Sequence, residues 1–266
     1  MLSQWFQEPR SLGLAQAAAA IVLALAVMLI ARRRAIHLER ETVVALVRGL
    51  VQVVAVGSVL LLLLQAPRWT AVPTLVAMNV AAAAIAARRA RGVPGAFRVS
   101  LLSIGLGAGL VIVPMTWLGV IDPALSSLVP VGSMLIANAM NSNALALDRF
   151  RSDVIAHAGQ IEAALALGAA PGNTVTRQVQ AAVEASMIPR IDSLRSLGIV
   201  WIPGVMAGML LSGVDPVYAA IYQFVVIAMI FAASGLTAVA STLLIRSFAF
   251  SPAQQLTLRP GAEVGG

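Results

Sequence analysis

The chain has 266 residues, of which 59% are hydrophobic and only 11% are charged, and its formal net charge is +7. A chain of this length cannot bury so much apolar surface in a water-soluble fold, so its composition predicts an integral membrane protein. Cysteine is absent, which excludes disulfides, thiolate metal sites and cysteine nucleophiles.

Apolar runs long enough to cross a membrane recur along the whole chain. A helix needs about 20 residues to cross about 30 Å of hydrocarbon. The runs lie at 14–31, 42–64, 70–87, 99–119, 127–147, 196–213 and 217–245. They predict an all-α, polytopic membrane protein with about seven transmembrane helices in a single domain, 1–266. The sixth run is short and is broken by Pro203-Gly204.

The arginines predict the orientation of these helices. All 18 basic residues are arginine, and 15 of them follow the first, third and fifth runs or lie in the C-terminal tail. These 15 are Arg32, Arg33, Arg34, Arg40, Arg88, Arg89, Arg91, Arg98, Arg149, Arg151, Arg177, Arg190, Arg195, Arg246 and Arg259. Basic loops stay in the cytoplasm, so we expect the N-terminus outside and the C-terminus inside a plasma or inner membrane. Anionic lipid head groups account for the positive charge without a nucleic-acid partner.

One polar segment, 148–194, interrupts the apolar chain on the predicted cytoplasmic side. Its pattern predicts a helical hairpin, with a first helix from Asp148 to Ala170 and a break at Pro171-Gly172-Asn173. The second helix is expected from Thr174 to Ile188, ending before Pro189. The tail from about Ser251 is expected to be loosely ordered.

The sequence offers little for catalysis. A P-loop needs a lysine to hold phosphates, and the chain has none, so it has no ATPase site of its own. Gly105, Gly107 and Gly109 lie inside an apolar run, where we interpret them as helix-packing residues, with Gly105 and Gly109 in a Gly-x-x-x-Gly spacing. No arrangement of acid, base and nucleophile occurs in or beside the runs, which disfavours a membrane enzyme.

Polar residues within two of the runs are candidates for a substrate pathway. Arg48 and Gln52 lie one turn apart on the second run, where they either line a cavity or reach back to the cytoplasmic surface. Met134, Asn138 and Asn141 share one face of the fifth run. These amides are costly in a membrane unless they line a pathway or a subunit interface, or bond to neighbouring helices.

The hairpin carries a motif that resembles the EAA loop of ABC transporter permeases. Glu162-Ala163-Ala164 is followed by Gly168 and later by Ile188-Pro189. The resemblance implies that this loop docks on a nucleotide-binding subunit through Glu162, Ala163, Ala164, Gly168 and Pro171. The small residues allow close approach, and Glu162 can pair with a basic residue of the partner. The alternative is an amphipathic hairpin that lies on the membrane surface.

A wider resemblance, over most of residues 40–230, is to the FetB-type iron-export permease family. The segments that carry it are Arg48–Gln52, Pro130–Met140, Leu167–Ala169, Ile188–Ser193, Leu197–Gly208 and Gly213–Pro216. The resemblance implies a permease subunit for metal homeostasis that pairs with a second copy and with separate ATPase subunits. ATP would be used by those subunits, and this chain would bind no cofactor.

The residues themselves leave the substrate open. Iron favours imidazole, carboxylate or thiolate ligands, whereas the runs offer amides, hydroxyls and thioethers, so we expect no metal site in this chain. The cargo is therefore iron passing with low affinity, a chelate or another small solute. The alternatives are an EAA-loop importer permease for a small solute and an ATP-independent channel or secondary carrier.

Overall fold

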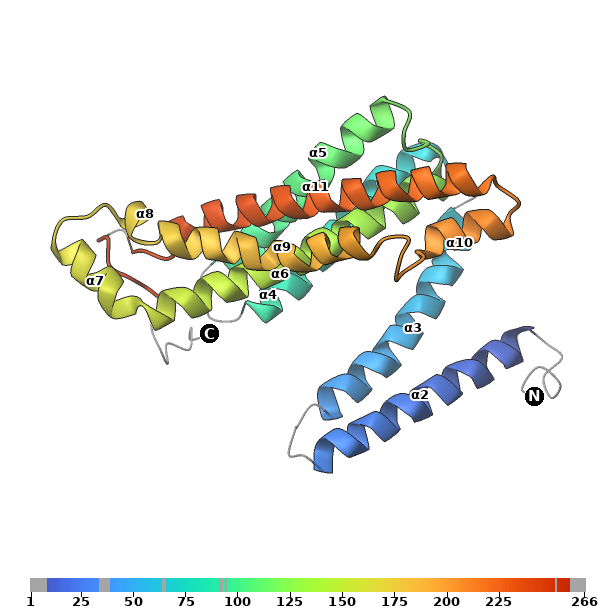
Figure 1. The fold of residues 1–266 in the computed structure, drawn as a ribbon, viewed down its shortest axis with the longest axis horizontal. Helices are drawn as coiled ribbons and strands as arrows, with labels where there is room; N and C mark the ends of the chain where they lie inside the picture. Colours follow the sequence, from blue (N-terminus) through green and yellow to red (C-terminus); the bar gives the residue numbers. More distant parts are fainter. Residues whose placement is uncertain are drawn as a thin grey trace. The chain divides into compact units, whose positions relative to one another are not determined.

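The computed structural model describes residues 9–33, 39–63, 66–90, 93, 95–251 and 253–258. The chain forms two compact units, Met1–Ala66 and Pro67–Gly266. The first unit holds α2 (Pro9–Arg33) and α3 (Glu39–Leu63), which contact each other (Figure 1). Their apolar side chains are largely exposed, as expected for helices that face lipid.

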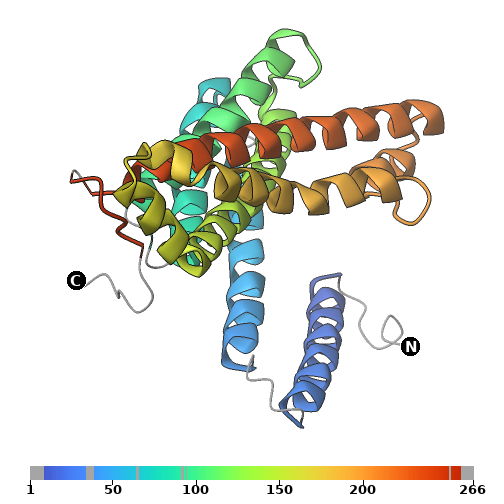
Figure 2. The ribbon, with the colours of Figure 1, turned by 60° about the vertical axis from the view of Figure 1, so that its left-hand side comes forward.

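The second unit is a bundle of helices. In chain order its elements are η1 (Arg68–Thr70), α4 (Ala71–Arg89), α5 (Ala96–Trp117), α6 (Leu125–Ala156), α7 (Ala158–Ala166), α8 (Pro171–Thr174), α9 (Thr176–Ser196), α10 (Gly204–Leu211) and α11 (Pro216–Phe248). The views in Figures 1 and 2 show α9 running beside α11, and α6 packs against both.

Five helices among the described residues are long and apolar enough to cross a membrane. They are Ser11–Ile30, Thr42–Val59, Arg68–Arg89, Ala96–Trp117 and Pro216–Phe248. The protein is therefore an all-α, multi-pass membrane protein, as predicted. The number of seven crossings stays a prediction.

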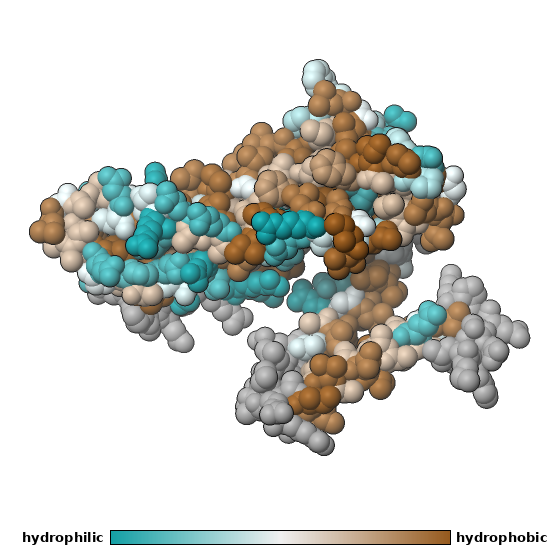
Figure 3. All heavy atoms as spheres, viewed as in Figure 1, coloured by the Kyte–Doolittle hydropathy of each residue, from teal (hydrophilic) through white to brown (hydrophobic). Residues whose placement is uncertain are grey.

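The predicted fifth span belongs to a longer helix. With 32 residues, α6 is about 48 Å long at 1.5 Å per residue, well beyond about 30 Å of hydrocarbon. It runs without interruption from the predicted span into the polar segment, so the hairpin does not begin as a separate element at Asp148. Figure 3 shows hydrophilic side chains gathered toward the α7–α8 end of this unit and apolar ones toward α5 and α10.

The predicted sixth span, 196–213, is not one continuous helix. After α9 ends at Ser196, the chain turns through Gly198, which has φ +75° and donates its N–H to the carbonyl of Trp201 at 3.1 Å. The eight residues of α10 then rise only about 12 Å, too little to cross the membrane alone. The Pro203-Gly204 break seen in the sequence marks the start of α10.

The predicted helix ends in the hairpin are wrong at both prolines. Pro189 lies inside α9, which continues to Ser196. A proline removes one helical hydrogen bond, but α9 packs along α6 and α11, which keeps it in line. Pro171 starts α8, because a proline suits the first position of a helix, and the first arm instead divides at His157 between α6 and α7.

Three apolar clusters hold the second unit together, and one lies at the hairpin end. It joins Phe150, Ile161, Val175 and Ile245, which come from α6, α7, the residue before α9, and α11. The tail after Ser251 contributes Leu256 and Leu258, each 3% exposed. The expectation of a loosely ordered tail is therefore wrong for residues 253–258, because two leucines complete this core.

Two of the three glycines of α5 allow close packing against neighbouring helices. A Cβ at Gly107 would lie 2.0 Å from Oγ1 of Thr237 on α11, and one at Gly105 would lie 2.9 Å from Nδ2 of Asn79 on α4. Gly109 has no neighbour within 4 Å. The packing interpretation is right for Gly105 and Gly107, whereas Gly109 makes no such contact within the described residues.

Candidate functional site

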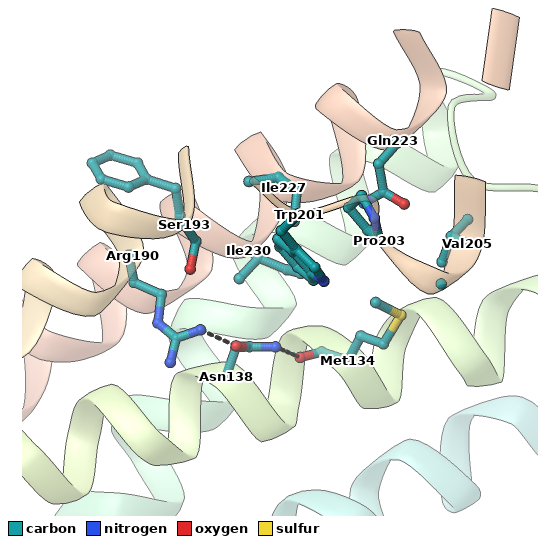
Figure 4. Close-up of a pocket in the computed structure, with 12 residues that line it drawn as sticks. Met134, Asn138, Arg190, Ser193, Trp201, Pro203, Val205, Gln223, Ile227 and Ile230 are labelled. Carbon is teal, nitrogen blue, oxygen red and sulfur yellow. Dashed lines mark hydrogen bonds between the residues drawn. The ribbon is translucent and has the colours of Figure 1, made fainter. Parts of the chain in front are cut away.

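A cavity of about 470 Å³ opens between α6, α9, α10 and α11 (Figure 4). The residues that line it are Met134, Asn138, Arg190, Ser193, Trp201, Pro203, Gly204, Val205, Gln223, Ile227, Ile230 and Phe231. Most of this wall is apolar, with a few polar groups, which is typical of a small-molecule site. Among these residues Arg190 is the only charged one.

Arg190 and Asn138 meet across the cavity. The Asn138 side chain donates from Nδ2 to the carbonyl of Met134 at 2.8 Å, which turns its Oδ1 outward. Arg190 donates from Nη1 to that Oδ1, and both hydrogen bonds are drawn in Figure 4. Arg190 forms no ion pair with any carboxylate in the described part of the chain. At the cavity, the polar contact between α6 and α9 among the described residues is therefore this amide–guanidinium hydrogen bond.

Gln223 links the other two helices of the cavity. Its side chain is 1% exposed, and its Oε1 accepts the backbone N–H of Met206 at 3.1 Å. Met206 lies in the first turn of α10, where backbone N–H groups have no partner within the helix. Gln223 on α11 thus supplies the acceptor that α10 lacks, while its own Nε2 has no partner among the described residues.

A second cavity of about 480 Å³, which we call the vestibule, lies on the other side of Arg190. Its lining comprises Arg89, Asn141, Ser142, Ala144, Leu145, Asp148, Ser186, Pro189 and Arg190. Arg190 is the one residue common to both linings. The structure thus places Met134 and Asn138 in the cavity and Asn141 in the vestibule.

The other two pathway candidates belong to the first unit. Arg48 and Gln52 are exposed residues of α3, in the first unit. Both cavities are lined by residues of the second unit. A role for Arg48 and Gln52 in transport stays a prediction.

The predicted docking residues form an exposed tip, residues 162–171. Gly168 has φ +87° and follows α7 in a Schellman motif. Its N–H donates to the carbonyl of Leu165 at 2.9 Å, and the N–H of Ala169 donates to the carbonyl of Ala164 at 3.0 Å. Leu167 is 89% exposed. Glu162, Ala163 and Gly168 are also exposed, and Ala164 and Pro171 are half-buried.

The residues on either side of the tip are buried in the core of the second unit. Ile161 is 2% exposed and Val175 is fully buried, so the elements on either side of the tip insert into the core shared with α6 and α11. The apolar face of the hairpin therefore packs against α6 and α11 of the same unit. An amphipathic hairpin lying on the membrane would instead direct that face toward lipid.

Comparison with known proteins identifies the family. Residues 14–250 match the family described as "Uncharacterised protein family (UPF0014)". The chain belongs to the UPF0014 family.

Several UPF0014 relatives align over most of both chains. "UPF0014 membrane protein STAR2" of Oryza sativa subsp. japonica is 32% identical, covering 90% of this chain and 84% of the relative. "Protein ALUMINUM SENSITIVE 3" of Arabidopsis thaliana is 30% identical, covering 92% of this chain and 90% of the relative. "Probable iron export permease protein FetB" of Escherichia coli (strain K12) is 29% identical, covering 87% of this chain and 90% of the relative. No solved structure matches the chain.

Sequence reasoning missed two residues that shape the cavity of this UPF0014 chain. The sequence pattern places Arg190 among the cytoplasmic arginines and not at a cavity, because it predicts that the helix ends before Pro189. Gln223 is an isolated amide in the first third of the last apolar run, a signal that could have identified it. The described residues contain no group of three His, Cys, Asp or Glu side chains placed to hold a metal ion.

Proposed function

We propose that this chain is the membrane-spanning permease subunit of an ABC transporter, driven by a separate ATPase subunit that docks on the tip. The chain itself would hold no cofactor, and ATP would be bound and hydrolysed by the partner. Two copies would pair in the membrane, each with its own ATPase subunit.

The observation that carries this proposal is that the helices on either side of the tip's hairpin also line the cavity. α6 precedes α7 and α9 follows α8, the two short helices that carry the tip, and α6 and α9 supply Asn138 and Arg190 to the cavity. Helices packed along their length move as stiff bodies because close-packed interiors transmit displacement. A displacement of the tip by a closing ATPase would therefore change the separation of α6 and α9 at the cavity.

The surface of the tip also suits docking. Its exposed residues are mostly small, and the Schellman turn at Gly168 presents backbone groups without a bulky side chain. Glu162, Ala163, Ala164, Gly168 and Pro171 are the proposed contact residues. Small exposed residues permit the close approach that a groove on a partner requires.

The proposed orientation follows from the arginines. The tip and the C-terminus would face the cytoplasm, where ATP is available, and the N-terminus would lie outside. We assign export of iron or another metal as the first activity to test, because a relative of 29% identity is named a probable iron export permease. Met134, Asn138 and Asn141, with Arg48 and Gln52 of the first unit, are the proposed pathway residues.

Reconstitution with an ATPase distinguishes this function from an ATP-independent carrier. The partner to use is a Walker-type ATPase encoded in a neighbouring reading frame. We expect the two chains to purify as a complex, and vesicles that contain both to transport solute only with ATP. Full-rate transport by this chain alone, without nucleotide or ATPase, would establish a channel or secondary carrier instead.

A further inference from the structure

Two donor groups of the cavity lining, on Arg190 and Gln223, lack acceptors among the described residues. The two side-chain amide oxygens, Oδ1 of Asn138 and Oε1 of Gln223, already accept from Arg190 and from the Met206 backbone. In contrast, Nε of Arg190 and Nε2 of Gln223 have no hydrogen-bond partner among the described residues. Buried donors without acceptors are costly, so a ligand that brings acceptors is favoured here.

The described lining of the cavity also carries a positive charge, which comes from Arg190. Arg190 is half-buried, belongs to no ion pair in the described part of the chain, and is the only charged residue in the lining. A guanidinium keeps its positive charge at any physiological pH and presents a planar set of N–H donors that matches carboxylate and phosphate oxygens. One neutral amide, that of Asn138, is a weak substitute for an anion at this position.

The vestibule extends this positive character. It carries two guanidinium groups, Arg89 and Arg190, against one carboxylate, Asp148. Hydroxyl and amide groups of Ser142, Ser186 and Asn141 line the rest of its polar wall. An anion that enters the vestibule would therefore reach Arg190 from a region of net positive charge.

We propose that Arg190 binds the transported solute, and that this solute is an anion rich in oxygen, such as a carboxylate, a phosphate or a metal held in an anionic chelate. The proposal rests on the proposed transport function and names its substrate class. A bare metal cation fits poorly, because a guanidinium repels it and the cavity offers no imidazole, carboxylate or thiolate ligand. The anion would replace Asn138 on Arg190, which would release α6 from α9 at this point.

Equilibrium binding to the full chain in lipid nanodiscs tests the proposal without an ATPase or ATP. The probes are citrate, ferric citrate, inorganic phosphate and ferrous iron alone, titrated by calorimetry into the wild-type protein, Arg190→Gln and Arg190→Lys. Arg195→Gln is the matched control, because Arg195 lies on the same helix, its side chain is 77% exposed and it pairs with Asp192 at 3.8 Å. Size-exclusion profiles verify that each variant is folded.

We expect at least one anionic probe to bind the wild-type protein and Arg195→Gln equally. Loss of charge-assisted hydrogen bonds should weaken its binding to Arg190→Gln by about 10- to 100-fold, with Arg190→Lys in between. Equal binding to the wild-type protein and Arg190→Gln overturns the proposal. So does the absence of binding of every anionic probe at millimolar concentration, or binding of ferrous iron alone that is independent of Arg190. Failure of an ATPase to bind the tip would refute the transport function and leave these titrations unaffected.

Discussion

Substitution of Gly168 tests whether the tip docks on an ATPase. Gly168 has φ +87°, and a Cβ added there meets no atom of the described residues within 4 Å, so the cost of alanine is conformational and local. That cost is about 1–2 kcal/mol, because an L-residue is disfavoured in the left-handed region. The strain falls on the Schellman turn alone, and the buried core beneath it is untouched.

A matched control lies in α7, the helix that Gly168 follows. Gly159 is exposed, helical and also free of neighbours within 4 Å, so Gly159→Ala should stabilise α7 by about 0.5–1 kcal/mol. If Gly168→Ala weakens the docking conformation by about 1–2 kcal/mol, affinity for the ATPase should fall by up to about 5- to 30-fold. Gly168→Arg adds a bulky charged side chain at the contact surface and should abolish ATP-coupled transport.

The assay measures ATPase binding to nanodiscs by interferometry and transport in vesicles, with the amount of chain in the membrane fraction as the check on insertion. We expect normal insertion for all three variants, reduced binding for Gly168→Ala and wild-type binding for Gly159→Ala. Wild-type transport by Gly168→Arg would refute the docking role of the tip.

Three further predictions follow from the packing and the orientation. Phe150 is fully buried in the hairpin core, so Phe150→Ala should lower the free energy of unfolding by about 3–5 kcal/mol and reduce the solute transported per ATP hydrolysed. A loss of stability below about 1 kcal/mol would show that this core does not support the tip. Gly107→Val should prevent stable folding, because even its Cβ would lie 2.0 Å from an α11 hydroxyl, whereas Gly109→Val, with nothing within 4 Å, should fold; equal thermal stability of the two would contradict the packing. Because the chain has no cysteine, Leu167→Cys should react with an impermeant maleimide only from the cytoplasm and Trp117→Cys only from outside, and the reverse pattern would overturn the orientation.

The membrane class and most helix positions were predictable from hydropathy, because a crossing helix must satisfy its backbone internally and present apolar side chains to lipid. The runs at 99–119 and 217–245 correspond closely to α5 (Ala96–Trp117) and α11 (Pro216–Phe248). Local composition fixes such elements almost alone, whatever they pack against.

The proline positions were less predictable because a helix can continue through proline when its neighbours hold it. Pro189 lies inside α9, along which α6 and α11 pack, and that tertiary support is invisible in a local pattern. A helix that ends before Pro189 does not include Arg190. In the continuous α9, Arg190 follows Pro189 and donates a hydrogen bond to Asn138. The order of residues 253–258 likewise depends on tertiary packing, because Leu256 and Leu258 complete an existing core.

The candidate site was predictable in part. The amide of Asn138 and the thioether of Met134 stood out as polar or polarisable groups in an apolar run, and both line the cavity. Their partners come from α9 and α11, far away in the sequence, so one helix face could not reveal the cationic group opposite. Gly168 was recognisable from its motif, whereas its left-handed conformation required the structure.

Distance measurement across the cavity during ATP turnover tests the central claim, that displacement of the tip moves α6 against α9. Spin labels on Ala137→Cys and Ile191→Cys would report it, because both residues are exposed beside Asn138 and Arg190 and the chain has no other cysteine. With the ATPase bound, we predict that ATP changes the inter-label distance distribution, and that Gly168→Arg abolishes the change. A distribution that stays constant through turnover, or that changes without the ATPase, would contradict the account.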